Sequence, residues 1–369
     1  MTKKIINKDL KDTNESNKKR YFACANTYAG FINYFSDIVD SHNIEKIYTI
    51  KTRDKSYSLI LGEIARNAEK KKYSVEYFFC PNDLNCLNGI VINELKTAVT
   101  VYSDSKHPVL IENIINLCDF YDETKLINHK KEILDLIAKK NEYNNLAYKF
   151  LKAANELAEN TSEMSEKYIN YDKLYSSVER LISKNIHAGE KHLHEKNNNS
   201  RTDEYKFINS VSLSGFPELS TFENEAKKIF YISNENFLGW HYTKIISEKF
   251  ANTCKVICPD ALNPDKIKAV YLRNSKILFV IKNKIPDKIY SEKYNFINME
   301  RFISPSFKKE NKQKLRFIQK CYKAITNEAV KYFSEAENIN TTAGDIYASS
   351  VKTSEKNKYT EAVIKKILP

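Results

Sequence analysis

Basic and hydroxyl side chains gather after an apolar run near residue 50, and their types suit phosphate chemistry. The run is residues 47–50 (IYTI), and the side chains that follow it are Lys51, Arg53, Lys55, Ser56 and Ser58. Lysine and arginine bind phosphate oxygens, a serine hydroxyl is an oxygen ligand for Mg²⁺, and the N-terminus of a helix attracts anions. These five residues are therefore the predicted phosphate or nucleotide contacts.

The same segment lacks most of what a working phosphate-binding loop requires. Such a P-loop has the pattern GxxxxGK[ST], in which glycines turn backbone amides toward the phosphates and the lysine contacts them. Here the segment is KTRDKSYSLI, so Tyr57 takes the lysine position in one register and Lys55 takes it in another. Neither register restores a glycine, and only seven of the 369 residues are glycine. We therefore predict a degenerate P-loop and assign no catalytic residue.

The acidic residue that would support magnesium is also missing from its expected place. It should end a second apolar strand, yet residues 97–101 (TAVTV) are followed by Tyr102 and Ser103, with Asp104 late. Phosphoryl transfer depends on positioning and on charge stabilisation, which the lysine, the glycines and this acid provide together. We expect no hydrolysis of ATP or GTP and no metal site.

The elements around the loop predict an α/β fold. Residues 47–51 and 75–79 are short runs rich in β-branched and aromatic residues, which indicates strands. Between them SLILGEIARNAEKKK has apolar positions at helical spacing and a lysine-rich end, which indicates a helix. Strands that alternate with helices favour a parallel sheet covered by helices. A long amphipathic segment at 125–159 and a returning helix at 168–186 predict a helical hairpin after the sheet.

The same order of elements recurs in the second half of the chain. Four blocks match in the same order. The first two are FACANTYAGF (22–31) with FINSVSLSGF (207–216) and IYTI (47–50) with IFYI (229–232). The third is Cys80-Pro81 and Asn85 with Cys258-Pro259 and Asn263, and the fourth is the apolar run 97–101 with the run 276–280. A repeat of this long period predicts two copies of one P-loop-like α/β unit. Residues 309–337 and 358–368 would form the helical hairpin of the second copy.

These patterns give the predicted domain organisation. The first unit spans residues 20–186, a polar, Asn-rich linker spans 187–204, and a more degenerate second unit spans 205–369. Three histidines of the linker, at positions 187, 192 and 194, are expected to be solvated rather than to bind a metal.

The second copy departs further from the P-loop pattern. Residues 234–241 (NENFLGWH) keep one glycine, Gly239, but Trp240 and His241 stand where the lysine and the serine should be. An indole is rigid and bulky, and magnesium prefers oxygen ligands to imidazole nitrogen. We predict that Trp240 packs into the second phosphate position and blocks it; the alternative is that it packs between helix and sheet.

The chain resembles a family of uncharacterised bacterial tandem P-loop ATPases, which are nucleotide-kinase-like. The resemblance rests on FACANTYAGF, VEYFFCPNDLNCLNGIVINELKTAV and IINLCDFYDETKLINHKKEI in the first half, and more weakly on CPDALNPDKIKAV in the second. It implies two P-loop units in tandem, with ATP and Mg²⁺ as ligands. The departures at both loops imply a member that has kept the fold and lost the hydrolysis.

Composition places few further limits on function. The net charge is +12, but many lysines lie among glutamates in predicted helices, as in KKEILDLIAKKNEY, which is typical of a solvated face. The seven cysteines form no CxxC pair, so reduced thiols are expected. The sequence shows no long apolar run and no secretory leader, so we expect a cytoplasmic protein without a membrane partner.

The predicted function is that of a pseudo-NTPase, which binds an unidentified protein partner or a weak anionic or nucleotide ligand. One alternative is an active ATPase or nucleotide kinase with an atypical loop, which would use Lys51, Arg53 or Lys55 as the phosphate cation and Ser58 for magnesium. The other is a nucleic-acid-binding protein that uses its basic surface.

Overall fold

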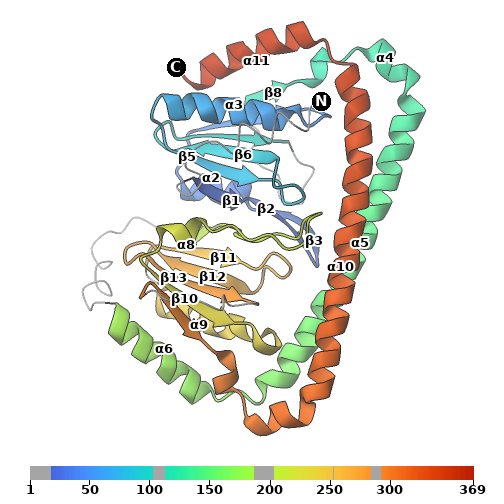
Figure 1. Ribbon diagram of the computed structural model, residues 1–369. Coiled ribbons are helices and arrows are strands. Elements are labelled where there is room, and N and C mark those ends of the chain that lie inside the picture. The colour runs from blue at the N-terminus through green and yellow to red at the C-terminus, as the bar shows by residue number, and fades with distance from the viewer. Residues whose placement is uncertain (1–17, 103–112, 187–202, 252, 284–291) are drawn as a thin grey trace. The chain divides into compact units, whose positions relative to one another are not determined.

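The protein is a mixed α/β chain with two six-stranded sheets, in which most strand pairs are parallel (Figure 1). The computed structural model describes residues 18–102, 113–186, 203–251, 253–283 and 292–369. The chain folds into two compact units. The first combines Met1–Lys149, Phe207–Thr221 and Glu328–Pro369, and the second combines Phe150–Lys206 and Phe222–Asn327. Each unit therefore contains segments from both halves of the sequence.

The sheet of the first unit has the strand order β1-β5-β6-β7-β4-β8. Its strands are β1 (Lys19–Phe22), β4 (Lys46–Lys51), β5 (Val75–Phe79), β6 (Leu87–Ile92), β7 (Thr97–Val101) and β8 (Asn113–Asn116). Strand β6 is antiparallel to its neighbours β5 and β7, and the other pairs are parallel. The carboxyl ends of β4 and β7 therefore lie at the same edge of the sheet.

The sheet of the first unit is buried because helices cover it. All five residues of β5 and the central four of β4 are buried, which explains why these strands are nearly continuous apolar runs. Helix α3 (Ser56–Lys70) buries a helical stripe that includes Ile60, Leu61 and Ile64. Helix α2 (Phe35–Ser41) lies on the opposite face (Figure 1).

The remaining elements of the first unit are short, apart from its long helices. They are the hairpin of β2 (Cys24–Thr27) and β3 (Gly30–Asn33), the 3-10 turn η2 (Cys118–Phe120), helix α4 (Glu123–Asn128) and helix α11 (Thr353–Ile367). Helix α11 buries Thr360, Ile364 and Ile367. Figure 1 shows α11 beside α3, on the face of the sheet opposite α2.

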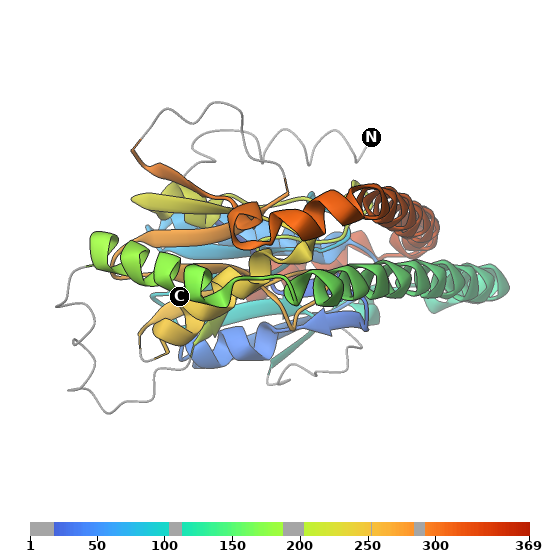
Figure 2. The same ribbon diagram turned by 90° about the horizontal axis from the view of Figure 1, so that it is seen from below.

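The sheet of the second unit has the strand order β9-β11-β12-β13-β10-β14. Its strands are β9 (Glu204–Tyr205), β10 (Lys228–Ser233), β11 (Lys255–Pro259), β12 (Ile267–Leu272), β13 (Ile277–Lys282) and β14 (Tyr294–Ile297). Helix α9 (Gly239–Lys249) follows β10, and helix α6 (Tyr171–Asn185) packs on α9, as can be followed in Figure 2. The shorter elements are α8 (Thr221–Glu225), η3 (Glu235–Phe237) and η4 (Met299–Phe302).

The two sheets share one topology. The strands of the two sheets match in order and direction. The pairs are β1 with β9, β5 with β11, β6 with β12, β7 with β13, β4 with β10 and β8 with β14. The first repeated block also folds alike. In each block a hydroxyl donates a hydrogen bond to the carbonyl oxygen of the glycine three residues later. The distance is 2.7 Å from Thr27 to Gly30 and 3.3 Å from Ser212 to Gly215. Both glycines, Gly30 and Gly215, have a φ above +100°, which only glycine adopts readily. This agreement supports the internal repeat seen in the sequence.

Two long helices carry the chain from one unit to the other. Helix α5 (Lys130–Glu166) starts in the first unit and ends in the second, and α10 (Pro305–Ser349) starts in the second and ends in the first. At about 1.5 Å per residue, helices of this length are far longer than the strands they follow. As a result α6 belongs to the second unit and α11 to the first. This differs from the predicted arrangement, in which each hairpin stays with the sheet that precedes it.

The predicted linker at 187–204 lies outside the described residues except for its last two. The described contacts place the boundaries between the units elsewhere, inside α5 and α10 and at positions 206 and 221. Among the described residues, no helix has the length and apolar composition needed to cross a membrane.

Candidate functional site

The loop between β4 and α3 lies at the carboxyl edge of the first sheet, where open α/β sheets bind ligands. Strand β4 ends at Lys51 and α3 begins at Ser56. Tyr121 holds the loop, because its hydroxyl accepts the Arg53 backbone N–H at 3.1 Å and lies 3.0 Å from Thr52 Oγ1. Burial raises the pKa of Tyr121 to about 12, so this phenol stays protonated at neutral pH. Tyr121 therefore ties the middle of the loop to the segment that follows β8.

Asp54, the residue before the N-cap Lys55, binds the first backbone amide of helix α3. Its Oδ1 accepts the Ser56 backbone N–H at 2.7 Å and the Thr52 hydroxyl at 3.3 Å, and the residue is only 7% exposed. Free amides at the start of a helix are the groups that bind an anion, and the helix dipole favours negative charge there. A carboxylate of the protein therefore occupies the position where the sequence predicted a phosphate.

A lysine from α11 compensates this carboxylate. Lys356 Nζ lies 3.7 Å from Asp54 Oδ2 and donates a hydrogen bond to Ser56 Oγ at 2.7 Å. The side chains of Lys356 and Asp54 are both largely buried, at 12% and 5% exposure. The charge of Lys356 and the hydroxyl of Ser56 are thus engaged within the protein.

The charge of Lys55 is also paired within the protein. Its ammonium group forms an ion pair with Glu337 of α10 and donates to Thr341 Oγ1 at 3.4 Å. Burial lowers the pKa of Lys55, but the charge and hydrogen bond of Glu337 outweigh this effect and raise the pKa above its ordinary value. Lys55 therefore stays charged, and its charge is directed to a carboxylate rather than to an open site.

Ser58 does not present a free hydroxyl for magnesium. Its Oγ accepts the backbone N–H of Leu87 at 2.9 Å, which ties the first turn of α3 to the start of β6. One lone pair of the oxygen that would coordinate the metal is therefore already used.

The five predicted contacts thus separate into two groups. Lys55, Ser56 and Ser58 come together at the start of α3, and each of them has a partner within the protein. Lys51 and Arg53 are exposed, and no ion pair of either side chain is present among the described residues. Asp104, considered as a late magnesium acid, lies outside the described residues.

Three residues that close the site were missed by the sequence analysis. Asp54 could have been noticed locally, because an aspartate near the start of a helix often accepts its first amides. Glu337 and Lys356 had none, since they reach the loop from helices that lie almost 300 residues further along the chain.

A cavity of about 270 Å³ opens beside the loop. Its walls come from the 52–55 loop, the first turn of α3, the 80–88 connection between β5 and β6, the end of β7, and α10. Three carboxylates line it, Asp54, Asp83 and Glu337, against two cations, Arg53 and Lys55. This balance disfavours the phosphate chain of a nucleotide.

The cavity also exposes two thiols that are poorly suited to nucleophilic chemistry. Cys80 and Cys86 both line it. Burial raises the pKa of Cys80 to about 11, and burial together with the charge of Asp83 raises the pKa of Cys86 further. The thiolate is the reactive form, so both groups are inert near neutral pH.

The corresponding loop of the second unit is closed by packing. Asn234 Oδ1 accepts the backbone N–H of Gly239, the first residue of α9, at 3.3 Å. A Cβ added at Gly239 would lie 3.0 Å from Ile281 Cγ2 and 3.1 Å from the Ser233 carbonyl oxygen. Leu238 is fully buried, and the ring of Phe237 packs 4.8 Å from that of Tyr322 on α10. Even one added carbon at Gly239 would therefore crowd its neighbours where the helix meets the sheet.

Trp240 is not the buried plug that the sequence predicted. Its ring is half-buried at the edge of the core, and Nε1 donates to Ser162 Oγ of α5 at 3.4 Å. Lys244 and Lys266 lie over the ring at 5.7 Å and 5.2 Å from its centre. The second half of α5, absent from the expected second unit, supplies the surface on which Trp240 packs.

His241, in the first turn of α9, is buried and loses its charge. It is 5% exposed, its Nδ1 lies 3.4 Å from the Tyr171 hydroxyl, and its Nε2 is buried without a hydrogen-bond partner among the described residues. Burial lowers its pKa to about 4, so the ring is neutral at pH 7. It contributes neither a cation for phosphate nor an oxygen for magnesium.

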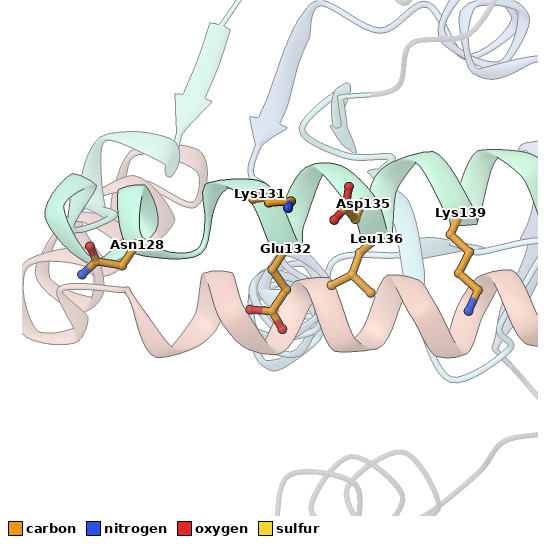
Figure 3. Close-up of a pocket in the computed structure, with 6 residues that line it drawn as sticks. All are labelled: Asn128, Lys131, Glu132, Asp135, Leu136 and Lys139. Carbon is orange, nitrogen blue, oxygen red and sulfur yellow. The ribbon is translucent and has the colours of Figure 1, made fainter.

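A second hollow, of about 470 Å³, runs along the start of α5 (Figure 3). Its lining side chains are Asn128, Lys131, Glu132, Asp135, Leu136 and Lys139. Two cations and two carboxylates balance each other on this largely exposed helix surface. It is a solvated helix face rather than a site.

Comparisons with protein-family models, with curated proteins and with solved structures give no match to this chain.

Proposed function

We propose that this chain is a degenerate P-loop-like protein that does not hydrolyse nucleoside triphosphates and acts by binding. The observation that carries the proposal is the Asp54 carboxylate at the start of α3, hydrogen-bonded at 2.7 Å to the Ser56 amide and compensated by Lys356. A phosphate at this position would meet a buried negative charge. Repulsion between like charges is strong where water is excluded, so the anion would have to displace Asp54 first.

The second unit supports the same proposal by another route. Its loop is filled by apolar packing around Gly239, and the residue at the metal position is a neutral histidine. Among the described residues, neither unit offers an unpaired lysine beside free helix amides at this loop, which is the arrangement that phosphoryl transfer needs. Both units then serve as a scaffold for binding a protein partner or a small ligand.

A second candidate is an active ATPase with an atypical loop, and one observation favours it. Lys55 and Lys356 both reach the start of α3, so two cations would be close to a phosphate if Asp54 moved away. This candidate requires the loop to open in the presence of nucleotide.

Phosphate release from ATP and GTP with Mg²⁺ separates the two candidates. The purified full chain is expected to release phosphate no faster than a buffer control. Turnover that is abolished by Lys55→Ala or Ser58→Ala, but not by Lys125→Ala, a change of an exposed lysine on α4 away from the loop, would overturn the proposal and establish the ATPase.

A further inference from the structure

We propose that the cavity of the first unit binds a small organic cation, an amine or guanidine, through Asp83. This inference gives a ligand class to the binding role proposed above and rests on it. It starts from the charges that line the cavity.

Asp83 brings to the cavity a carboxylate whose charge Lys55 offsets only in part, because Lys55 pairs directly with Glu337. The other two carboxylates are matched inside the protein, Glu337 by Lys55 and Asp54 by Lys356. Asp83 accepts only from neutral donors, which are the backbone and side-chain amides of Asn85, both at 2.9 Å, and the Cys86 thiol at 3.5 Å. No ion pair of Asp83 is present among the described residues. The remaining cation of the lining, Arg53, is exposed to solvent.

Three aromatic residues also line the cavity, namely Phe31, Tyr57 and Tyr102. The face of an aromatic ring attracts a cation, and the attraction is stronger where water is excluded. Rings combined with a carboxylate are the usual means of recognising an organic ammonium group, whereas they offer nothing to a phosphate.

Two polar groups of the wall are also available to a ligand. Neither the Tyr57 hydroxyl nor the Asn340 amide has a hydrogen-bond partner among the described residues. Burial raises the pKa of Tyr57 well above its ordinary value, and the nearby Cys80, Cys86, Glu337 and Asp83 add to the effect. The phenol is therefore protonated at neutral pH, and Tyr57 lines the same cavity as Asp83 and Glu337.

The size of the cavity limits the ligand. A volume of about 270 Å³ lies just below the lower end of the usual range for small-molecule pockets, about 300 Å³. A molecule of amino-acid size fits this space, and a nucleoside triphosphate does not.

Calorimetric titration of the full chain with agmatine and with putrescine tests the inference. Butane-1,4-diol serves as the neutral analogue and pyrophosphate as the anion. Saturable binding of at least one of the two cations is expected, with no binding of the diol or of pyrophosphate. Absence of saturable binding by both cations, or binding of the diol with equal affinity, would overturn the inference.

Two variants with the same change of charge decide whether Asp83 is the contact. Asp83→Asn keeps the acceptor for the Asn85 amides and should weaken cation binding by about tenfold or more, because a charge-assisted hydrogen bond becomes neutral. Asp119→Asn removes an exposed charge of the same unit outside the cavity and should change affinity by less than about twofold. Equal weakening by both variants would show surface charge alone and contradict the inference. Hydrolysis of ATP by the wild type would refute the proposed function without changing this comparison of variants.

Discussion

The two loops that precede α3 and α9 hold the same place in the same topology, yet they are closed in different ways. The first is closed by charge, with Asp54 at the helix start and with Lys55 and Lys356 each paired to a carboxylate. The second is closed by packing, with Gly239 pressed against Ile281. A site closed by charge can be altered by changing one group. A site closed by packing cannot, because space is missing as well as chemistry.

The largest expected effect comes from adding one methyl group at Gly239. Gly239→Ala should lower the free energy of unfolding by about 2 kcal/mol, because the new Cβ would lie 3.0 Å from Ile281 and 3.1 Å from a backbone oxygen that cannot easily move. Gly62→Ala, inside α3, is the matched control. Nothing lies within 4 Å of its added Cβ, so it should raise stability by about 0.5–1 kcal/mol.

Urea unfolding followed by circular dichroism measures both variants. If Gly239→Ala proves as stable as the wild type, the second loop has room to spare, and its closure by packing is wrong.

A smaller loss is expected at Asp54, and its size depends on the replacement. Asp54→Ala removes the acceptor of the Ser56 amide and leaves Lys356 with the Ser56 hydroxyl alone, which should destabilise by about 1–2 kcal/mol. Asp54→Asn keeps an acceptor for the Ser56 amide, so its free energy of unfolding should fall by less. Thermal unfolding of both variants checks this order. If the two replacements lose equal stability, the acceptor of the Ser56 amide contributes nothing, and the account of the first loop needs revision.

The acid sensitivity of the second unit should trace in part to His241. Its pKa is about 4 in the folded protein and near 6.5 when unfolded, so from pH 6.5 down to 4 the unfolded chain binds the proton and the folded chain does not. Above pH 7 the ring is neutral in both states, so this destabilisation is absent. The free energy of unfolding falls progressively as the pH drops from 6.5 to 4. His241→Gln should flatten this part of the stability profile.

The exposed His129, which lies beside Glu132, provides the control for this pH effect. His129→Gln should leave the fall in stability between pH 6.5 and 4 in place. If both variants reduce the fall in stability between pH 6.5 and 4 equally, the burial of His241 is not the cause of that fall.

Much of the fold was accessible from the sequence because it is encoded locally. The apolar run at 47–51 and the helical stripe that follows it correspond to β4 and α3, and the four repeated blocks agree with the shared topology of the sheets. The glycine of each first block marks a turn with positive φ, which only glycine adopts readily.

What could not be predicted depends on contacts between distant parts of the chain. Periodicity locates α5 and α10 but does not say where along each helix the chain passes from one unit to the other. For this reason Trp240, expected to plug a loop, instead packs on Ser162 of α5. For the same reason Lys356 and Glu337, which close the first loop, carried no signal near residue 55.

The most direct test of the account is a calorimetric titration of pyrophosphate into the wild type and Asp54→Asn, at low and at high salt. The wild type should give no saturable heat, because a buried carboxylate holds the helix start. Asp54→Asn keeps an acceptor for the Ser56 amide, removes the negative charge and frees Lys356, so it should bind pyrophosphate, and more weakly as salt is raised. Saturable binding by the wild type that is lost in Lys55→Ala would contradict the account, since the site would then be open as it stands.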